Sequence, residues 1–322
     1  MTRPLVVVLG ASGFLGTAIA AELAGHPVRL RLVARRPVVG PAGAEVRRVD
    51  LTGPGAVAEA VAGADVVVNL VAHIEGASTW RVDEGDTAAE RVNVGVARDL
   101  VDALRARRGA PPPVVLFAGS LSQVGRSTGP LSGTEEDRPV TAYDRQKTTV
   151  ERMLFEAGGA GVLRGIVLRL GTVYGRGSVP PELEHGVVSG MARRALAGQP
   201  LTVWGDGLVR RDLVCVEDVA RAFAAALGHA DALAGRHWLI GTGEPVAVVD
   251  LFSMIAEAVA ERTGAPAVPV ERVESAHAGD SDAVDFVVGT SAFADVTGWR
   301  PRVGLRAGLA GAVAALAPVV TA

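Results

Sequence analysis

Short apolar runs alternate with helical patterns along the first half of the chain. Leu5–Leu9, 64–72 and 114–118 are runs of mainly apolar residues, which is typical of strands buried on both faces. Phe14–Leu23 and 87–108 instead carry apolar residues at helical spacing. Strands that alternate with helices predict βαβ units, and hence a doubly wound α/β fold built on a parallel sheet.

The same patterns place the remaining elements. Further strands are expected at 28–33, 45–49, 162–170 and 237–240. Further helices are expected at 56–62, 143–157, 183–196, 217–227, 248–262 and 307–316. Residues 201–216 predict either a hairpin or a turn between extended segments. We expect the main domain at 1–172 and a smaller lobe over the carboxyl edge of the sheet at 173–322, with segments near 212–240 and 284–290 crossing back.

Composition narrows the class of protein. The 322 residues carry a formal net charge of −3 and 49% are apolar, which favours a globular core over disorder. The charge argues against a nucleic-acid binder, and no run approaches the roughly 18 apolar residues of a membrane-spanning helix. One cysteine and six histidines without ligand spacing indicate neither a disulfide framework nor a metal site. We therefore expect a cytoplasmic enzyme without nucleic-acid or membrane partners.

A glycine-rich turn, residues 10–16, joins the first expected strand to the first expected helix. Glycines permit close approach of the backbone to a pyrophosphate, and the helix N-terminus supplies N–H groups and a positive dipole end. The strand–turn–helix setting favours dinucleotide binding over an ordinary glycine turn. The residues expected to bind the cofactor here are Gly10, Ser12, Gly13, Phe14, Leu15 and Gly16.

The end of the second expected strand bears on the choice of cofactor. An NAD site usually has an acidic residue there for the ribose 2′-hydroxyl, whereas this chain has Arg35 and Arg36. Two guanidinium groups suit a 2′-phosphate, which favours NADP over NAD, although two solvated loop arginines would give the same pattern. The other residues expected beside the cofactor are Asp50, Leu51, Leu70, Val71 and Ala72.

Three residues suggest the chemistry. Lys147 is the one lysine among 32 basic residues, and it follows Tyr143, one of two tyrosines, by four positions on an expected helix. We expect the Lys147 ammonium to lower the pKa of Tyr143 and to contact the cofactor, so that the phenol exchanges a proton with substrate. Ser120, at the end of a strand, is expected to hydrogen-bond the substrate oxygen. The alternative is a buried tyrosine and a surface lysine that happen to be four apart.

Together these residues resemble an extended short-chain dehydrogenase/reductase of the sugar-nucleotide epimerase/dehydratase family. The resemblance implies about seven parallel strands in a Rossmann-type sheet, a carboxyl-terminal lobe for a nucleotide sugar, and a homodimer. It rests on the glycine turn, Asp50, Ser120, the Tyr143/Lys147 pair, and residues 168–175, 211–219 and 298–301.

Departures from the family pattern narrow the activity. Leu121 and Ser122 stand where sugar dehydratases carry an acid/base pair, which argues against water elimination. Thr172 stands where many relatives have asparagine, while Arg211 keeps the usual diphosphate-binding arginine. The expected substrate-binding residues are Ser78, Thr79, Trp80, Ser122, Thr172 and Arg211.

Residues 72–81 resemble the corresponding stretch of ketoreductases that act on TDP-4-keto-6-deoxyhexoses in antibiotic deoxysugar pathways. His73 or residues 78–81 could line the sugar or could order the next helix. The leading hypothesis is an NADPH-dependent 4-ketoreductase in which Tyr143 donates the proton. The alternatives are a 4-epimerase with tightly held NAD and a non-catalytic NADP-sensing protein.

Overall fold

The computed structural model describes residues 3–73, 82–107, 109–127, 129–176, 186–274, 284–289 and 291–317. A seven-stranded sheet in the order β11-β6-β5-β4-β1-β2-β3 forms its centre, and every pairing is parallel. The Rossmann-type α/β prediction is therefore confirmed. The strands are β1 (Leu5–Leu9), β2 (Arg29–Ala34), β3 (Glu45–Arg48), β4 (Val66–Asn69), β5 (Val114–Ser120), β6 (Arg164–Leu170) and β11 (Arg236–Ile240).

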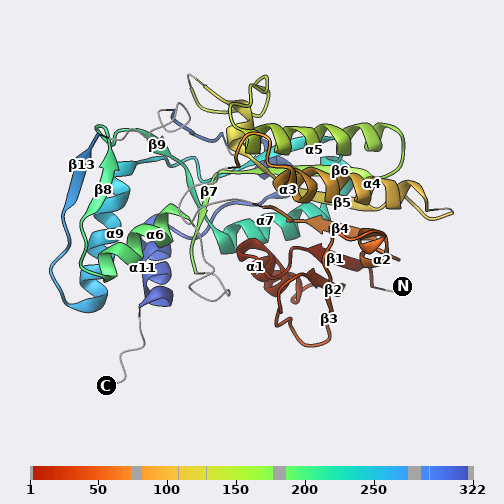
Figure 1. Ribbon diagram of the computed structural model, residues 1–322, viewed down its shortest axis with the longest axis horizontal. Coiled ribbons are helices and arrows are strands. Elements are labelled where there is room, and N and C mark those ends of the chain that lie inside the picture. Colours follow the sequence, from red (N-terminus) through yellow and green to blue (C-terminus); the bar gives the residue numbers. More distant parts are fainter. Residues whose placement is uncertain are drawn as a thin grey trace.

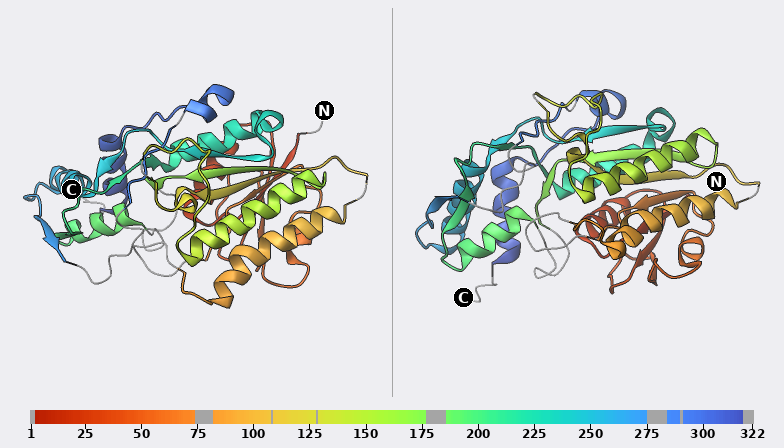
Figure 2. Two further views of the ribbon diagram at one scale, coloured as in Figure 1. Left: turned by 90° about the horizontal axis from the view of Figure 1, so that it is seen from above. Right: turned by 45° about the horizontal axis from the view of Figure 1, so that its top comes forward.

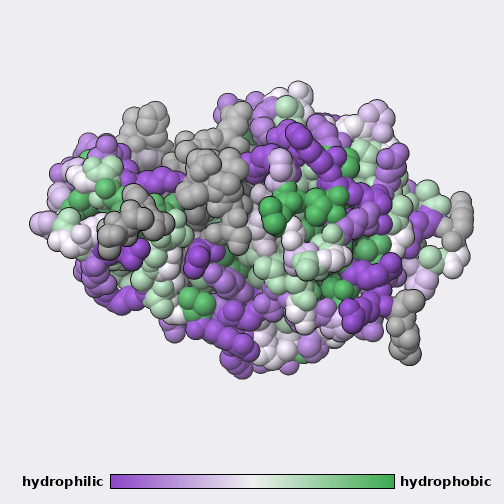
Figure 3. Space-filling view, turned by 90° about the horizontal axis from the view of Figure 1, so that it is seen from below, coloured by the Kyte–Doolittle hydropathy of each residue, from purple (hydrophilic) through white to green (hydrophobic). Residues whose placement is uncertain are grey.

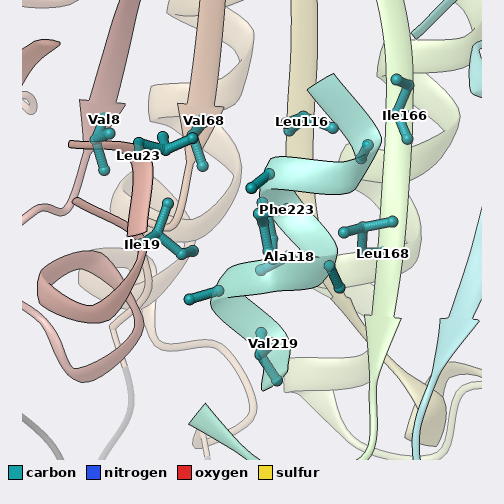
Figure 4. Close-up of a cluster of buried hydrophobic side chains, with 14 of the residues drawn as sticks. Val8, Ile19, Leu23, Val68, Leu116, Ala118, Ile166, Leu168, Val219 and Phe223 are labelled. Atoms are coloured by element: carbon teal, nitrogen blue, oxygen red, sulfur yellow. The ribbon is translucent and has the colours of Figure 1, made fainter. Parts of the chain in front are cut away.

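Helices cover both faces of the sheet (Figure 1, Figure 2). On one face α1 (Phe14–Leu23) and α7 (Val216–Gly228) pack side by side, with Ile19 and Phe223 buried against the strands (Figure 4). The core of the opposite face is formed with α2 (Ala56–Ala60), α4 (Val96–Arg105) and α5 (Ala142–Gly159). Burial of strand side chains on both faces explains the continuous apolar runs of the sequence.

The helix expected at 87–108 is broken into three parts. It comprises α3 (Thr87–Glu90), a π-helical turn at Arg91–Gly95 and α4, which ends at Arg105. The π turn contains the buried Asn93, whose side chain bonds to groups outside the helix. Single π turns within α-helices often occur at functional sites.

A second group of elements lies beside one end of the sheet (Figure 1). Its buried core draws on α6 (Val187–Leu196), α9 (Val248–Thr263) and α11 (Leu305–Leu316). The short strands are β7 (Thr172–Tyr174), β8 (Leu201–Trp204), β9 (Arg210–Arg211), β10 (Leu213–Cys215), β12 (Val246–Ala247) and β13 (Val270–Val273). Two further short helices, α8 (Ala230–Leu233) and α10 (Ser291–Thr297), lie instead against the central sheet, at β6 and β11.

Residues 201–216 do not form a hairpin. β8 pairs in parallel with β13, β9 pairs with β12, and β10 pairs in parallel with β7. The alternative expectation, a turn between extended segments, therefore holds. Each of these segments finds its partner at a distance along the chain, which local turn patterns do not reveal.

The surface seen from below mixes the two kinds of side chain. Hydrophilic residues cover much of it, and smaller apolar groups lie among them (Figure 3). Among the described residues, no helix is both long and apolar enough to cross a bilayer.

Candidate active site

The sequence motifs gather at the carboxyl edge of the sheet. Leu9, the last residue of β1, is paired with Asn69, the last residue of β4. Ser120 ends the neighbouring strand β5, and the N-termini of α1 and α5 open near this edge. In open parallel sheets, ligands bind in the crevice outside these strand ends.

The glycine turn places backbone amides at the start of α1. Gly10 adopts φ +84° and lies against Leu70 and Val71, where an added Cβ would come within 3.1 Å of the Leu70 carbonyl carbon. At Gly16 an added Cβ would collide with the backbone of Gly10 and Ala11. No side chain caps this helix, so its first-turn N–H groups suit a diphosphate. The residues present therefore fit a dinucleotide.

Arg35 and Arg36 follow β2 directly, and both are exposed. Asp50 lies near them but is already engaged, because its carboxylate accepts hydrogen bonds from the Thr52 amide at 3.0 Å and hydroxyl at 2.7 Å. These bonds hold the pKa of Asp50 below its ordinary value. Leu51 is buried in the core beside it.

Tyr143 and Lys147 lie one turn apart on α5, and both are buried. The Lys147 ammonium donates to the Ala118 carbonyl of β5 at 2.9 Å. It lies 4.6 Å from the centroid of the Phe117 ring and 5.5 Å from that of the Tyr143 ring. Burial lowers the pKa of Lys147 to about 8, so most of the lysine keeps its charge at neutral pH.

The pKa of Tyr143 departs from the sequence-based expectation. Burial raises it above its ordinary value, and the charge of the adjacent Asp144 raises it further. The sequence analysis expected the Lys147 ammonium to lower this pKa, whereas its net direction is upward. The physical reason is the loss of water around the phenol, which penalises the tyrosinate more than one neighbouring ammonium stabilises it. The phenol is consequently held in its protonated, donor form.

Ser120 belongs to a chain of three side chains. Its hydroxyl lies 2.7 Å from the hydroxyl of Ser122, and the Ser122 hydroxyl donates to Oδ1 of Asp144. The backbone N–H of Ser122 also points at the Ser120 oxygen, at 3.3 Å. The structure thus brings Ser120 together with Ser122, and through Asp144 with the turn of α5 that carries Tyr143.

A buried ionic network lies behind this chain. Gln123 accepts from the Ser120 amide at 2.8 Å and donates to Glu151 at 3.0 Å. Glu151 in turn accepts two bonds from Arg169, which is fully buried and also forks onto both oxygens of Asp137. The network fixes the end of β5 that presents Ser120.

Glu151 is the centre of this network and stays ionised. It also meets His237 of β11, whose Nδ1 lies 2.8 Å from its Oε1. Burial alone would raise the pKa of Glu151, but the bonds from His237 and Arg169 outweigh it and bring the pKa down to about 2. Arg169 therefore faces a full negative charge at neutral pH.

Asn93 and Asp144 are site residues that the sequence analysis missed. Asn93 accepts from the His73 amide at 2.6 Å and donates to the His73 carbonyl and to Gln146, the neighbour of Lys147. It thereby joins the segment after β4 to α5. The sequence did carry a signal for each residue. Asn93 is a polar residue among the apolar positions of an expected helix, and Asp144 directly follows Tyr143.

The expected substrate residues fall into separate groups. The Thr172 amide donates to the Asp212 carbonyl at 3.0 Å. The Arg211 guanidinium lies 5.5 Å from the Phe286 ring and donates to the Val284 carbonyl, so β9 meets the segment 284–286. Ala72 and His73 follow β4 at the sheet edge. Three of the expected substrate residues lie outside the described part of the chain: Ser78, Thr79 and Trp80.

Comparison with protein families gives one match. The model of the NAD dependent epimerase/dehydratase family matches residues 6–241. This range runs from β1 to the end of β11, and so includes the glycine turn, Ser120, Tyr143 and Lys147.

Three individual proteins illustrate the similarity. D-erythronate dehydrogenase of Cupriavidus necator is 28% identical over 60% of this chain, and the match spans 62% of that relative's length. dTDP-6-deoxy-L-talose 4-dehydrogenase (NAD(P)(+)) of Kitasatospora kifunensis is 28% identical over 94% of this chain and 92% of its own. The UDP-glucose 4-epimerase of Thermus thermophilus, solved in complex with NAD, superposes with a TM-score of 0.82 at 27% identity, covering 98% of this chain and 100% of that one.

Proposed function

Because the chain belongs to the NAD-dependent epimerase/dehydratase family, and is an NAD(P)-dependent enzyme, we propose that it reduces the 4-keto group of a TDP-linked 4-keto-6-deoxyhexose with NADPH. The observation that carries the proposal is the geometry of α5, where Tyr143 and Lys147 lie one turn apart and the Lys147 ammonium is 5.5 Å from the centroid of the Tyr143 ring. A protonated phenol is the form that a reductase needs, since it must deliver a proton to the new alkoxide.

Each side chain has a role in this reaction. When bound, the nicotinamide supplies the hydride. Tyr143 donates its proton to the reacting oxygen, and Lys147 stabilises the tyrosinate that remains and contacts the cofactor. Ser120 hydrogen-bonds the hydroxyl group that results. We place the cofactor's diphosphate at residues 10–16 and its adenosine near Asp50 and Leu51.

The substrate assignment rests on the sugar-facing residues and on one relative. Leu121 and Ser122 offer no acid/base pair for dehydration. Ser122 and Thr172 are assigned to the sugar and Arg211 to the diphosphate. Ser78, Thr79 and Trp80 remain predicted sugar contacts. The relative named dTDP-6-deoxy-L-talose 4-dehydrogenase, which matches 94% of this chain, supports a TDP-linked sugar with chemistry at C4.

The test is a coupled absorbance assay. TDP-4-keto-6-deoxyglucose is offered with NADPH and, in parallel, with NADH, and loss of the reduced nicotinamide is followed. We expect consumption that depends on the enzyme and is faster with NADPH. Absence of consumption, together with interconversion of the two C4 epimers of a TDP-6-deoxyhexose supplied without reduced cofactor, would transfer the proposal to 4-epimerase, which the likeness to an NAD-bound UDP-glucose 4-epimerase favours as the second candidate. Stoichiometric NAD in the purified protein would point the same way.

Replacing Arg35 and Arg36 together by alanine tests the cofactor assignment. Both are exposed beside the expected ribose, so the double variant should fold normally and lose its contacts to a 2′-phosphate. We expect the Kd for NADPH to rise about tenfold or more, since bonds to charged groups are worth about 1.5–3 kcal/mol, with little change for NADH. Fluorescence titration measures both values. The matched control replaces the exposed residues Arg105 and Arg152 by alanine and should change neither Kd. If the Arg35/Arg36 variant bound NADPH and NADH more weakly to the same extent, the assignment would be refuted.

A further inference from the structure

The hydrogen-bond chain from Ser120 to Asp144 has a fixed direction. Asp144 is only 2% exposed, and donors converge on both of its carboxylate oxygens. Oδ1 accepts from the Ser122 hydroxyl, and Oδ2 accepts from the amide and the hydroxyl of Thr141, at 3.1 and 2.7 Å. A set made up of donors suits an ionised carboxylate, which can only accept.

The bond from Ser122 to Asp144 determines which serine donates in the bond between Ser120 and Ser122. A hydroxyl carries one proton, and Ser122 gives its proton to Asp144. In the 2.7 Å bond between the two serines, Ser122 must therefore accept and Ser120 must donate. The Ser122 amide also donates to the Ser120 oxygen at 3.3 Å. Toward the substrate, Ser120 consequently presents a lone pair and not its proton.

We infer that Asp144, acting through Ser122, sets Ser120 as a hydrogen-bond acceptor, so that the site binds the reacting oxygen better as an alcohol than as a ketone. With the alcohol bound, one continuous series of donors forms: the Tyr143 phenol to the alcohol oxygen, the alcohol proton to Ser120, Ser120 to Ser122, and Ser122 to Asp144. With the ketone bound, the lone pair of Ser120 faces the lone pairs of the carbonyl. Asp144 is thus a positioning residue, and the inference rests on the proposed reaction at Tyr143 and Ser120.

Two substitutions should free the Ser120 proton for the substrate, each in a different way. Ser122→Ala removes the acceptor of the Ser120 proton, which then becomes available to the substrate. In Asp144→Asn the side-chain oxygen stays with the two Thr141 donors, because they need an acceptor, and its NH₂ group turns to Ser122. Ser122 then donates to Ser120, and the proton of Ser120 is again released toward the substrate. Asp144→Asn also removes a charge beside Tyr143, whereas Ser122→Ala does not.

The preference of the site for the alcohol over the ketone can be measured in ternary complexes that cannot react. Calorimetry gives the Kd of the 4-hydroxy product for the enzyme with NADPH, and of the 4-keto sugar for the enzyme with NADP⁺. We expect both variants to shift the ratio of these constants toward the ketone, each by about tenfold relative to wild type, which is the scale of one mismatched hydrogen bond. Ser253→Ala on α9, remote from this chain of hydroxyls, is the matched control and should leave the ratio unchanged.

The outcomes separate the relay from its alternatives. The relay is the series of hydrogen bonds from Ser120 through Ser122 to Asp144. A shift of the Kd ratio in both variants supports it. A shift in Asp144→Asn alone would assign the effect to the charge next to Tyr143 and overturn the relay, and no shift in either variant would also overturn it. A substrate-free arm keeps the inference distinct from the proposed function: the charge-assisted Ser122 hydroxyl proton should give a protected downfield ¹H resonance that is lost in Ser122→Ala and retained in Ser120→Ala. If keto-sugar reduction fails in the assay above, this resonance still tests the Ser122–Asp144 bond, from which the orientation of Ser120 is inferred, and its absence from the wild type would overturn the inference.

Discussion

Replacing Tyr143 by phenylalanine is expected to lower kcat by about 10²–10⁴-fold, the range that a positioned general acid contributes. The substitution removes one hydroxyl and keeps the ring that packs with Val82, Ala89 and Ala142. The Kd for NADPH should stay within about twofold, because the phenyl ring leaves Lys147 and the glycine turn in place. Stopped assays of product formation at saturating substrate, together with a fluorescence titration of NADPH, measure the two quantities.

The second tyrosine provides the control. Tyr174, at the end of β7, is buried in the core of the second group of elements, where its ring faces Gly308. Tyr174→Phe makes the same chemical change and should leave kcat within a few-fold of wild type. A Tyr143→Phe variant that retains full turnover would remove Tyr143 from the reaction and with it the proposed mechanism.

The fold could be predicted because its signals are local. Burial of β1, β4 and β5 on both faces requires continuous apolar runs, and the amphipathic helices between them require helical spacing. Gly10 adopts a positive φ, and Gly16 stands where the turn leaves no room for a Cβ, so the sequence indicates the turn directly. The pairing of β8 with β13 was not predictable, since three helices and four strands lie between residues 201–204 and 270–273 in the sequence.

The candidate site was predictable in part for the same reason. The spacing of Tyr143 and Lys147 placed them on one face of a helix, and the structure places them so. Spacing carries no information on burial, however, and burial decides the direction of the Tyr143 pKa. The bonds of Asn93 to His73, and of Ser122 to Asp144, join residues 20 and 22 positions apart. Such partners become visible only when the strand ends and α5 have been placed side by side.

Two motifs that carried the family resemblance have a structural explanation. Asp218, at the start of α7, accepts from the amides of Arg302 and Val303 at 2.8 and 3.0 Å. The indole of Trp299 donates to the Asp218 carbonyl at 3.0 Å. The segment that follows α10 is thus tied to the helix that packs against α1 and the sheet. Asp218 and Trp299, one from each motif, therefore stabilise the fold beside the site.

Replacing Glu151 by glutamine is expected to lower the free energy of unfolding by about 3–5 kcal/mol, the usual cost of removing one partner from a buried ion pair. Arg169 is fully buried and would keep Asp137 as its acidic partner while facing an amide in place of a carboxylate. The NH₂ group of glutamine would also replace one of the two carboxylate oxygens, each of which is bonded to Arg169 and to one further side chain, Gln123 or His237. Urea-induced unfolding at pH 7 measures the difference.

The pH dependence distinguishes this charge from a packing effect. Glu151 has a pKa of about 2 in the folded chain against an ordinary value of 4.5, so its contribution to stability is complete above about pH 4.5 and is lost as the pH falls toward 2. The difference in unfolding free energy between wild type and Glu151→Gln should therefore become smaller as the pH is lowered from about 5 to about 3. Asp102→Asn, in the exposed Asp102–Arg105 pair, is the matched control and should change stability by less than about 1 kcal/mol. A gap that stays constant with pH would mean that Glu151 stabilises the end of β5 by its shape alone, and that its charge does not hold Arg169 in place.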